Sequence, residues 1–130
     1  MITPAALREI LEPARSQPVR ILSGYTLKAG GVYGFERAGL RGYSVLVVTV
    51  RASYDPNSTA GVRVRWLYSP DGVNYDSVED SEAQGYYYNL SFKPGSVRQA
   101  TVPIPLLSPH VRVEVVNLDP EYPVTLDLWV

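Results

Sequence analysis

The stretch Val62-Arg63-Val64-Arg65-Trp66-Leu67-Tyr68-Ser69 decides the fold class, because apolar and charged residues alternate along it. Successive side chains of a β-strand point to opposite sides of a sheet, so such a segment has one face for a core and one for water. The same alternation returns in 111–115 and in 124–130. A chain with several half-buried strands of this kind is predicted to be an antiparallel all-β domain.

Turn-forming residues divide the chain into nine predicted strands, near 19–27, 31–37, 43–52, 62–69, 73–79, 85–93, 96–104, 110–117 and 123–130. The segment Ser69-Pro70-Asp71-Gly72 has the residue preferences of a type I turn, so we expect 62–69 to pair with 73–79. The loop 117–121 should likewise fold 110–117 back against 123–130. Eight or nine strands at this spacing are typical of a β-sandwich of the jelly-roll kind.

The N-terminal residues predict one short helix, which opens at the cap-and-proline pair Thr3-Pro4. Leu7, Ile10 and Leu11 form a single apolar stripe along it, which would lie against the sheet or against another subunit. We therefore expect a helix and lead-in over 1–17 and a single β-sandwich domain over 18–130.

Length and composition exclude several classes of function. The chain has 130 residues, which suit one domain, and no cysteine, which excludes disulfides, thiolate metal sites and a cysteine nucleophile. A net charge of −1 offers no broad positive field, so nucleic acid is not an expected partner.

The sequence shows neither a signal peptide nor a membrane span, which predicts cytoplasmic synthesis without Sec-type export. Arginine is strongly favoured over lysine and the chain has 11 prolines, a bias typical of thermophiles, with a GC-rich genome as the alternative explanation.

The segment 43–50 breaks the alternation because it is apolar on both faces. Such a strand must be covered on both sides, either as a central strand under the N-terminal helix or by a neighbouring subunit. Val45 and Val47, together with the apolar stripe of the helix, are therefore candidate oligomer contacts.

Residues with catalytic or metal-binding chemistry are sparse. His110 is the single histidine, and no nucleophile on a G-x-S-x-G type of turn accompanies it, so we expect no catalytic residue. Asp55, Asn57 and Thr59 have the alternate spacing of calcium ligands, but Gly61 is misplaced for a calcium loop and no glutamate closes it. A solvated turn is the preferred interpretation, with Ca²⁺ as the alternative; we expect no other cofactor.

Tyrosine is used ten times against two phenylalanines, which is typical of rings whose hydroxyl groups reach a wet surface. Such surfaces occur at protein interfaces and at sugar-binding faces, although packing within a sandwich would also use tyrosine. The candidate binding residues are Tyr75, Tyr86, Tyr87, Asn89 and Trp129.

The segment from Val62 through Ser69-Pro70-Asp71-Gly72-Val73-Asn74-Tyr75 to Asp76 is similar to a hairpin of discoidin-type and carbohydrate-binding jelly rolls, and of related modules in phage tail and virion proteins. The ending 111–117 resembles the closing strands of the same modules. This resemblance implies a jelly-roll sandwich that works through adhesion. The chain departs from it in having neither the disulfide nor the aromatic loop spikes of discoidin domains.

A domain without cysteine or an export signal fits an assembly component better than a secreted sugar-binding module. The first hypothesis is a non-enzymatic β-sandwich that acts through protein contacts, as a homo-oligomer or within a larger virion, tail or surface assembly of a thermophile or its virus. The second is a glycan-binding module that uses the tyrosine-rich face. A small hydrolase is third, because nothing in the sequence announces a catalytic cluster.

Overall fold

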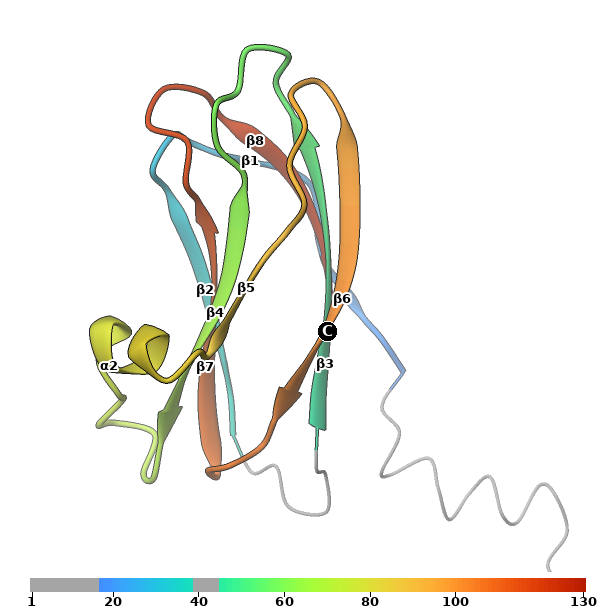
Figure 1. The fold of residues 1–130 in the computed structure, drawn as a ribbon. Coiled ribbons are helices and arrows are strands. Elements are labelled where there is room, and N and C mark those ends of the chain that lie inside the picture. The colour runs from blue at the N-terminus through green and yellow to red at the C-terminus, as the bar shows by residue number, and fades with distance from the viewer. Residues whose placement is uncertain (1–16, 39–44) are drawn as a thin grey trace, which may run out of the picture.

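A computed structural model describes residues 17–38 and 45–130 as two packed β-sheets (Figure 1). Sheet A contains β1 (Arg20–Leu27), β8 (Val124–Trp129), β3 (Val45–Tyr54) and β6 (Val97–Pro105) in that order, and sheet B contains β2 (Val32–Arg37), β7 (His110–Asn117), β4 (Val62–Ser69) and β5 (Tyr87–Asn89). Every strand pair is antiparallel. The predicted antiparallel all-β sandwich is confirmed. The predicted N-terminal helix with Leu7, Ile10 and Leu11 lies outside the described residues.

The chain crosses from one sheet to the other at almost every connection. Only β4 and β5 follow each other within one sheet, with the short helix α2 (Val78–Ala83) between them. The orders β1-β8-β3-β6 and β2-β7-β4-β5 are those of an eight-stranded jelly roll, as the strand count predicted. This topology leaves four edge strands, β1 and β6 in sheet A and β2 and β5 in sheet B.

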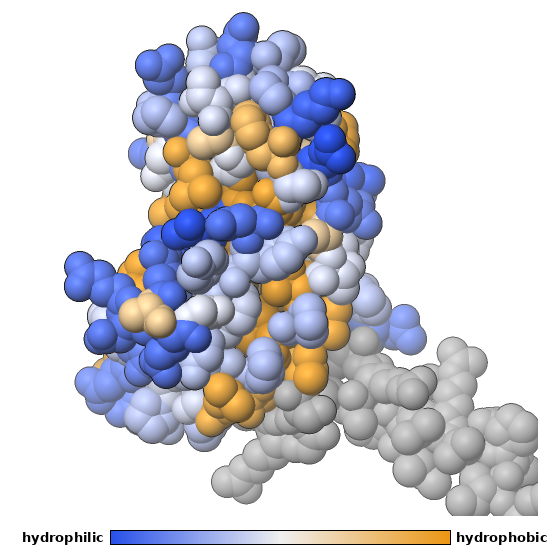
Figure 2. All heavy atoms as spheres, viewed as in Figure 1, coloured by the Kyte–Doolittle hydropathy of each residue, from blue (hydrophilic) through white to orange (hydrophobic). Residues whose placement is uncertain are grey.

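The core lies between the sheets and is built from the inward residues of both. Along β4, Val62 and Val64 are fully buried, whereas Arg63 and Arg65 are on the outer side. Val113 and Leu126 supply the same kind of side chain from β7 and β8. Each fully buried side chain of this size contributes about 1.5–3 kcal/mol relative to exposure. Figure 2 shows apolar side chains in the seam between the two sheets, seen from the side where β5 and β6 run.

The predicted strand 73–79 and its hairpin with 62–69 are wrong. The Asp71 carboxylate accepts the backbone N–H groups of Val73 and Asn74, each at 2.8 Å, and so holds the chain in a loop. Ser77 then caps α2 by accepting the N–H of Asp80 at 3.1 Å. Side-chain oxygens that accept nearby backbone N–H groups compete with the hydrogen bonds between strands. Here the side-chain hydrogen bonds form and the predicted strand does not.

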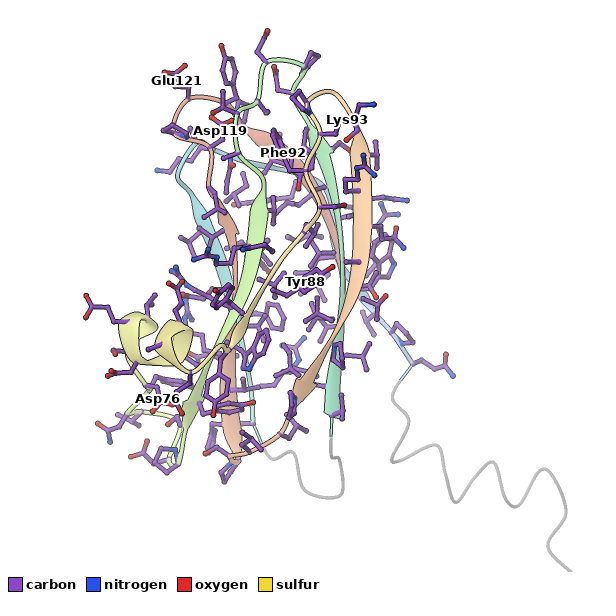
Figure 3. All side chains as sticks on the ribbon, in the orientation of Figure 1. Asp76, Tyr88, Phe92, Lys93, Asp119 and Glu121 are labelled. Atoms are coloured by element: carbon purple, nitrogen blue, oxygen red, sulfur yellow. The ribbon has the colours of Figure 1, made fainter. Side chains whose placement is uncertain are left out.

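The predicted hairpin between 110–117 and 123–130 is also wrong, because β7 and β8 belong to different sheets. The loop between them is held by Asn117, whose side-chain amide donates to the carbonyl oxygens of Lys28 (3.1 Å) and Tyr122 (2.9 Å). Asp119, only 1% exposed, accepts the N–H groups of Glu121 and Tyr122 at 2.8 and 2.9 Å. These hydrogen bonds hold the loop that crosses the end of the sandwich from sheet B to sheet A. Asp119 and Glu121 are labelled at that end in Figure 3.

β5 covers three residues instead of the predicted 85–93. Before it, the N–H of Tyr86 is taken by the carbonyl oxygen of Ser81 at the end of α2 (3.0 Å). Backbone hydrogen bonds to β4 continue one residue beyond β5 at each end, since Trp66 donates to the carbonyl oxygen of Tyr86 (3.1 Å) and Leu90 donates to that of Val62 (2.9 Å). Leu90 is on the inward side and is 5% exposed.

β3 is a central strand of sheet A, between β8 and β6. Its inward residues Val48 and Val50 are fully buried. Its outward residues Val45 and Val47 remain substantially exposed among the residues that the structure describes. The apolar character of 43–50 on both faces is thus half explained by the core.

Candidate functional site

The outer face of sheet A carries exposed apolar side chains at one end. Val45 is 42% exposed and Val47 is 49% exposed. In the strand register they lie directly opposite Pro105 and Pro103 of β6, which are exposed as well. Residues directly opposite in an antiparallel pair are neighbours on one face of the sheet. We call Val45, Val47, Pro103 and Pro105 the apolar patch.

Trp129 lies on the same outer face, and its ring is covered by two arginines of its own chain. The guanidinium carbons of Arg20 and Arg51 each lie 5.1 Å from the centroid of the indole ring. This is the distance of a cation–π contact. Trp129, a predicted binding residue, is therefore half-buried by intramolecular contacts.

Asp127 holds these two arginines in place. Its carboxylate accepts a hydrogen bond from Arg20, one from Nε of Arg51 at 3.2 Å and one from the backbone N–H of Gly24 at 2.9 Å. The Arg20 side chain, followed by the Gly24 N–H, lowers the pKa of Asp127 to about 2. Asp127 thus neutralises one of the two arginine charges within the chain, and the cluster keeps one net positive charge.

The outer face of sheet B is different, because a row of alternating charges crosses three of its strands, β2, β7 and β4, and includes α2. The side chains in the row are Glu36, Arg112, Glu114, Arg65, Glu82 and Arg63. Glu114 is in the middle, and its two oxygens accept Nε of Arg65 at 2.8 Å and Nε of Arg112 at 3.1 Å. Glu82 of α2 lies within 3.5 Å of both Arg65 and Arg63. The row links α2 to the sheet and pairs every charge in it.

The row ends at two of the predicted binding residues, Tyr87 and Asn89. The guanidinium of Arg63 lies over the Tyr87 ring at 4.5 Å from its centroid. Nε of Arg63 donates to the side-chain oxygen of Asn89 at 2.8 Å. The structure therefore brings Tyr87 and Asn89 together, and Arg63 already occupies both.

The other predicted tyrosines do not join them. Tyr86 packs against the core, with its ring centroid 5.2 Å from that of Tyr68 and 6.4 Å from that of Trp66. Tyr75 lies toward the opposite end of the charged row, where burial, and next the charge of Glu36, raise its pKa. The predicted tyrosine-rich face is thus divided between the core and two ends of sheet B.

The predicted calcium ligands are engaged in turn hydrogen bonds. The Asp55 carboxylate accepts the N–H of Asn57 at 2.8 Å. Thr59 donates its N–H at 2.6 Å and its hydroxyl at 3.4 Å to the buried carboxylate of Asp119. Burial raises the pKa of Asp119, but hydrogen bonds from four backbone N–H groups together outweigh burial and lower the pKa to about 2. Across 17–38 and 45–130, no group of three or more histidine, cysteine or acidic side chains could hold a metal ion.

His110 is opposite Ser69 in the register of β4 and β7, next to the turn that contains Asp71. A Cβ at Gly72 would meet the imidazole at 2.8 Å, so the ring is packed under that turn. The Ser69 hydroxyl is bonded to Asp71 (3.1 Å) and to the N–H of Gly72 (2.8 Å), not to the histidine. The three side chains are close but do not form a relay.

Two features of the site could not be found from the local pattern. Pro103 and Pro105 complete the apolar patch, and the proline-x-proline spacing in a predicted strand was their only signal. Asp119 fixes the loops at one end of the sandwich, and in the sequence it resembles any other turn aspartate.

No family model matches the chain, and no curated protein matches it. Among solved structures, the chain is similar to a family GH115 4-O-methyl-alpha-glucuronidase, BtGH115A, described as specific for decorated arabinogalactans. The sequence identity is 14%, the TM-score is 0.47, and the match covers 88% of this chain but only 16% of the glucuronidase. Within the described residues, no helix has the length and apolar character needed to cross a membrane.

Proposed function

We propose that the protein is a non-enzymatic assembly component that associates with further copies of itself through the outer face of sheet A. The observation that carries this proposal is the apolar patch, where Val45 and Val47 leave 42% and 49% of their surface in water beside two exposed prolines. Removing apolar surface from water is favourable by about 25 cal/mol per Å², against which the entropic cost of association must be set. A contact with a second copy would supply that burial.

The surroundings of the patch suit such a contact. Trp129 is held in one orientation by Arg20 and Arg51, so its ordering on binding would cost little conformational entropy. Tryptophan and arginine are also the side chains most enriched where protein interfaces gain their energy. A jelly roll that associates through a sheet face fits a structural role in a virion, tail or surface assembly.

Glycan binding by the tyrosines has less support. Tyr86 is partly buried and packs against the core, and Arg63 covers the ring of Tyr87 and binds Asn89. A sugar would have to displace the arginine before it could stack on Tyr87.

The test is size-exclusion chromatography with light scattering over a concentration series. Wild type should have a mass above that of one chain, and the double variant V45E/V47E should lower it. The matched control is V97E, since Val97 is a 60% exposed valine at the far end of the same pair of strands. A wild-type monomer at all concentrations would refute the proposal, and equal loss in V97E would refute the location.

A further inference from the structure

The four edge strands differ in how they could receive another strand. In β6, the N–H of Tyr54 bonds to the carbonyl oxygen of Ser96, so even-numbered residues bond to β3 and odd-numbered residues face the open edge. Pro103 and Pro105 are odd-numbered and have no N–H to offer there. β1 has two register irregularities against β8, and β5 has three residues. Prolines, bulges and short length are known protections of sheet edges.

β2 has none of these protections. It pairs with β7 over six consecutive residues without a register shift, and it contains no proline. The N–H of Asn117 bonds to the carbonyl oxygen of Gly31, which places Gly31, Tyr33, Phe35 and Arg37 on the β7 side. The N–H groups of Val32, Gly34 and Glu36 therefore face the open edge, and in the described parts of the chain no backbone group pairs with them.

We propose that β2 pairs with β2 of a second copy, antiparallel and about a two-fold axis, which joins the two B sheets into one. This inference rests on the proposed function, because it requires that the protein self-associates. A two-fold contact uses the same surface on both copies and closes without further partners. With the axis at Phe35, Gly34 is directly opposite the partner subunit's Glu36, and residues on the same side of both sheets meet.

The charges around Gly34 favour this register. A side chain at Gly34 would overlap the guanidinium of Arg112, so this guanidinium lies over β2 itself. Across the two-fold axis it would face the partner subunit's Glu36. Glu36 is half exposed and already within 3.3 Å of Arg112 in its own chain, so one carboxylate could serve both arginines. The two Arg112–Glu36 contacts would form reciprocally.

One intramolecular contact has to change. Arg37 donates to the carbonyl oxygen of Glu36 at 2.9 Å, which is one of the groups at the open edge. The exposed guanidinium would leave this carbonyl when the N–H of the partner subunit's Gly34 takes its place. An exposed hydrogen bond of this kind is weak, so its loss does not oppose pairing strongly.

Two separate contacts per chain predict assemblies larger than a dimer. The apolar patch is in sheet A and the β2 edge is in sheet B, so neither contact blocks the other. Wild type should therefore exceed two chains. V45E/V47E should leave dimers joined at β2, and a variant blocked at β2 should leave dimers joined at the patch.

The blocking variant is E36P, which removes an N–H from the open edge; its matched control is E36A, which removes the same carboxylate but keeps the N–H. We expect light scattering to show a reduced mass for E36P and a smaller change for E36A. Circular dichroism melting verifies that both variants are folded.

Cross-linking tests the register without depending on E36P. The chain lacks cysteine, so E36C carries a single thiol, and diagonal neighbours on one sheet face are about 7–8 Å apart. A short bis-maleimide should link E36C into covalent dimers. It should not link N57C, which places the thiol in an exposed loop that belongs to neither proposed contact.

The outcomes separate the two proposals. If wild type associates but E36P retains its mass and E36C does not cross-link, the β2 contact is wrong and the proposed function stands. If wild type is a monomer throughout, the proposed function fails and the β2 contact fails with it.

Discussion

The outer faces of the two sheets differ in the side chains that they expose to water. On sheet B, six charged side chains from three strands and α2 pair with each other, and the polar groups at the end of the row are occupied as well. On sheet A, the charges gather around Asp127 and leave Val45 and Val47 exposed beside two prolines. The charges on the outer face of sheet B are paired within one chain, whereas the apolar patch on sheet A is where we propose that a second copy binds.

Glu114 is where the charged face should be most sensitive. E114A removes a carboxylate that is 9% exposed and leaves Arg65 and Arg112 without their common acceptor. We expect a loss of about 2–3 kcal/mol in the free energy of unfolding, measured by urea denaturation. The control E36A removes an exposed carboxylate of the same row and should cost less than about 0.5 kcal/mol. Equal effects of the two would contradict a structural role for the centre of the row.

On the outer face of sheet A, Trp129 has the largest expected effect on the stability of one chain. W129A removes the ring that lies between Arg20 and Arg51, and two such contacts at a partly exposed site are worth about 1–2 kcal/mol together. W129F should recover part of this value, because phenylalanine keeps a smaller ring for the two cations. Denaturant unfolding below the association range measures both, and no gain in W129F over W129A would argue against the cation–π contacts.

Asp127 should make the stability of the chain sensitive to acid through the outer face of sheet A. Its pKa is about 2 in the folded chain, below the ordinary value of 3.8. A lowered pKa gives stability that is present above the ordinary value and is lost as pH falls from about 4 toward 2. The melting temperature of wild type should therefore fall over this window more steeply than that of D127N. Asp119 contributes to both proteins, so the difference between them reports Asp127, and parallel curves would contradict its role.

The smallest effect on stability is expected at the apolar patch itself. V45T/V47T should change the free energy of unfolding by less than about 0.5 kcal/mol, since both side chains are on the outer face. V48T, on the buried side of the same strand, should cost about 1–3 kcal/mol because it buries a hydroxyl without a partner. Comparable losses in both would mean that the patch is part of the core of the single chain.

The sequence predicted the layers of this fold better than its connections. The alternation of Val62, Arg63 and Val64 depends only on the chain's local geometry, so it revealed the strands and the sandwich. Which strand lies beside which is decided by residues far apart. The burial of Asn117 and Asp119, which carry the chain from β7 across to β8, has no local signature.

The prediction of a hairpin after β4 was wrong for a different reason. Ser69-Pro70-Asp71-Gly72 does reverse the chain, but the Asp71 carboxylate and the Ser77 cap use the following N–H groups before a second strand can. The serine at 77, with an aspartate three residues on, is a helix-capping pattern that was visible in the sequence. The candidate site was predicted in part, since Val45 and Val47 were identified from their doubly apolar strand, whereas Pro103 and Pro105 became their neighbours only through the strand register.

Self-association through the apolar patch is tested most directly by the solution mass of the wild-type protein, measured by light scattering across a concentration series and compared with V45E/V47E and V97E. We predict a mass well above the 14.4 kDa of one chain, reduced by V45E/V47E and unchanged by V97E. A wild-type mass of 14.4 kDa at every concentration would contradict it.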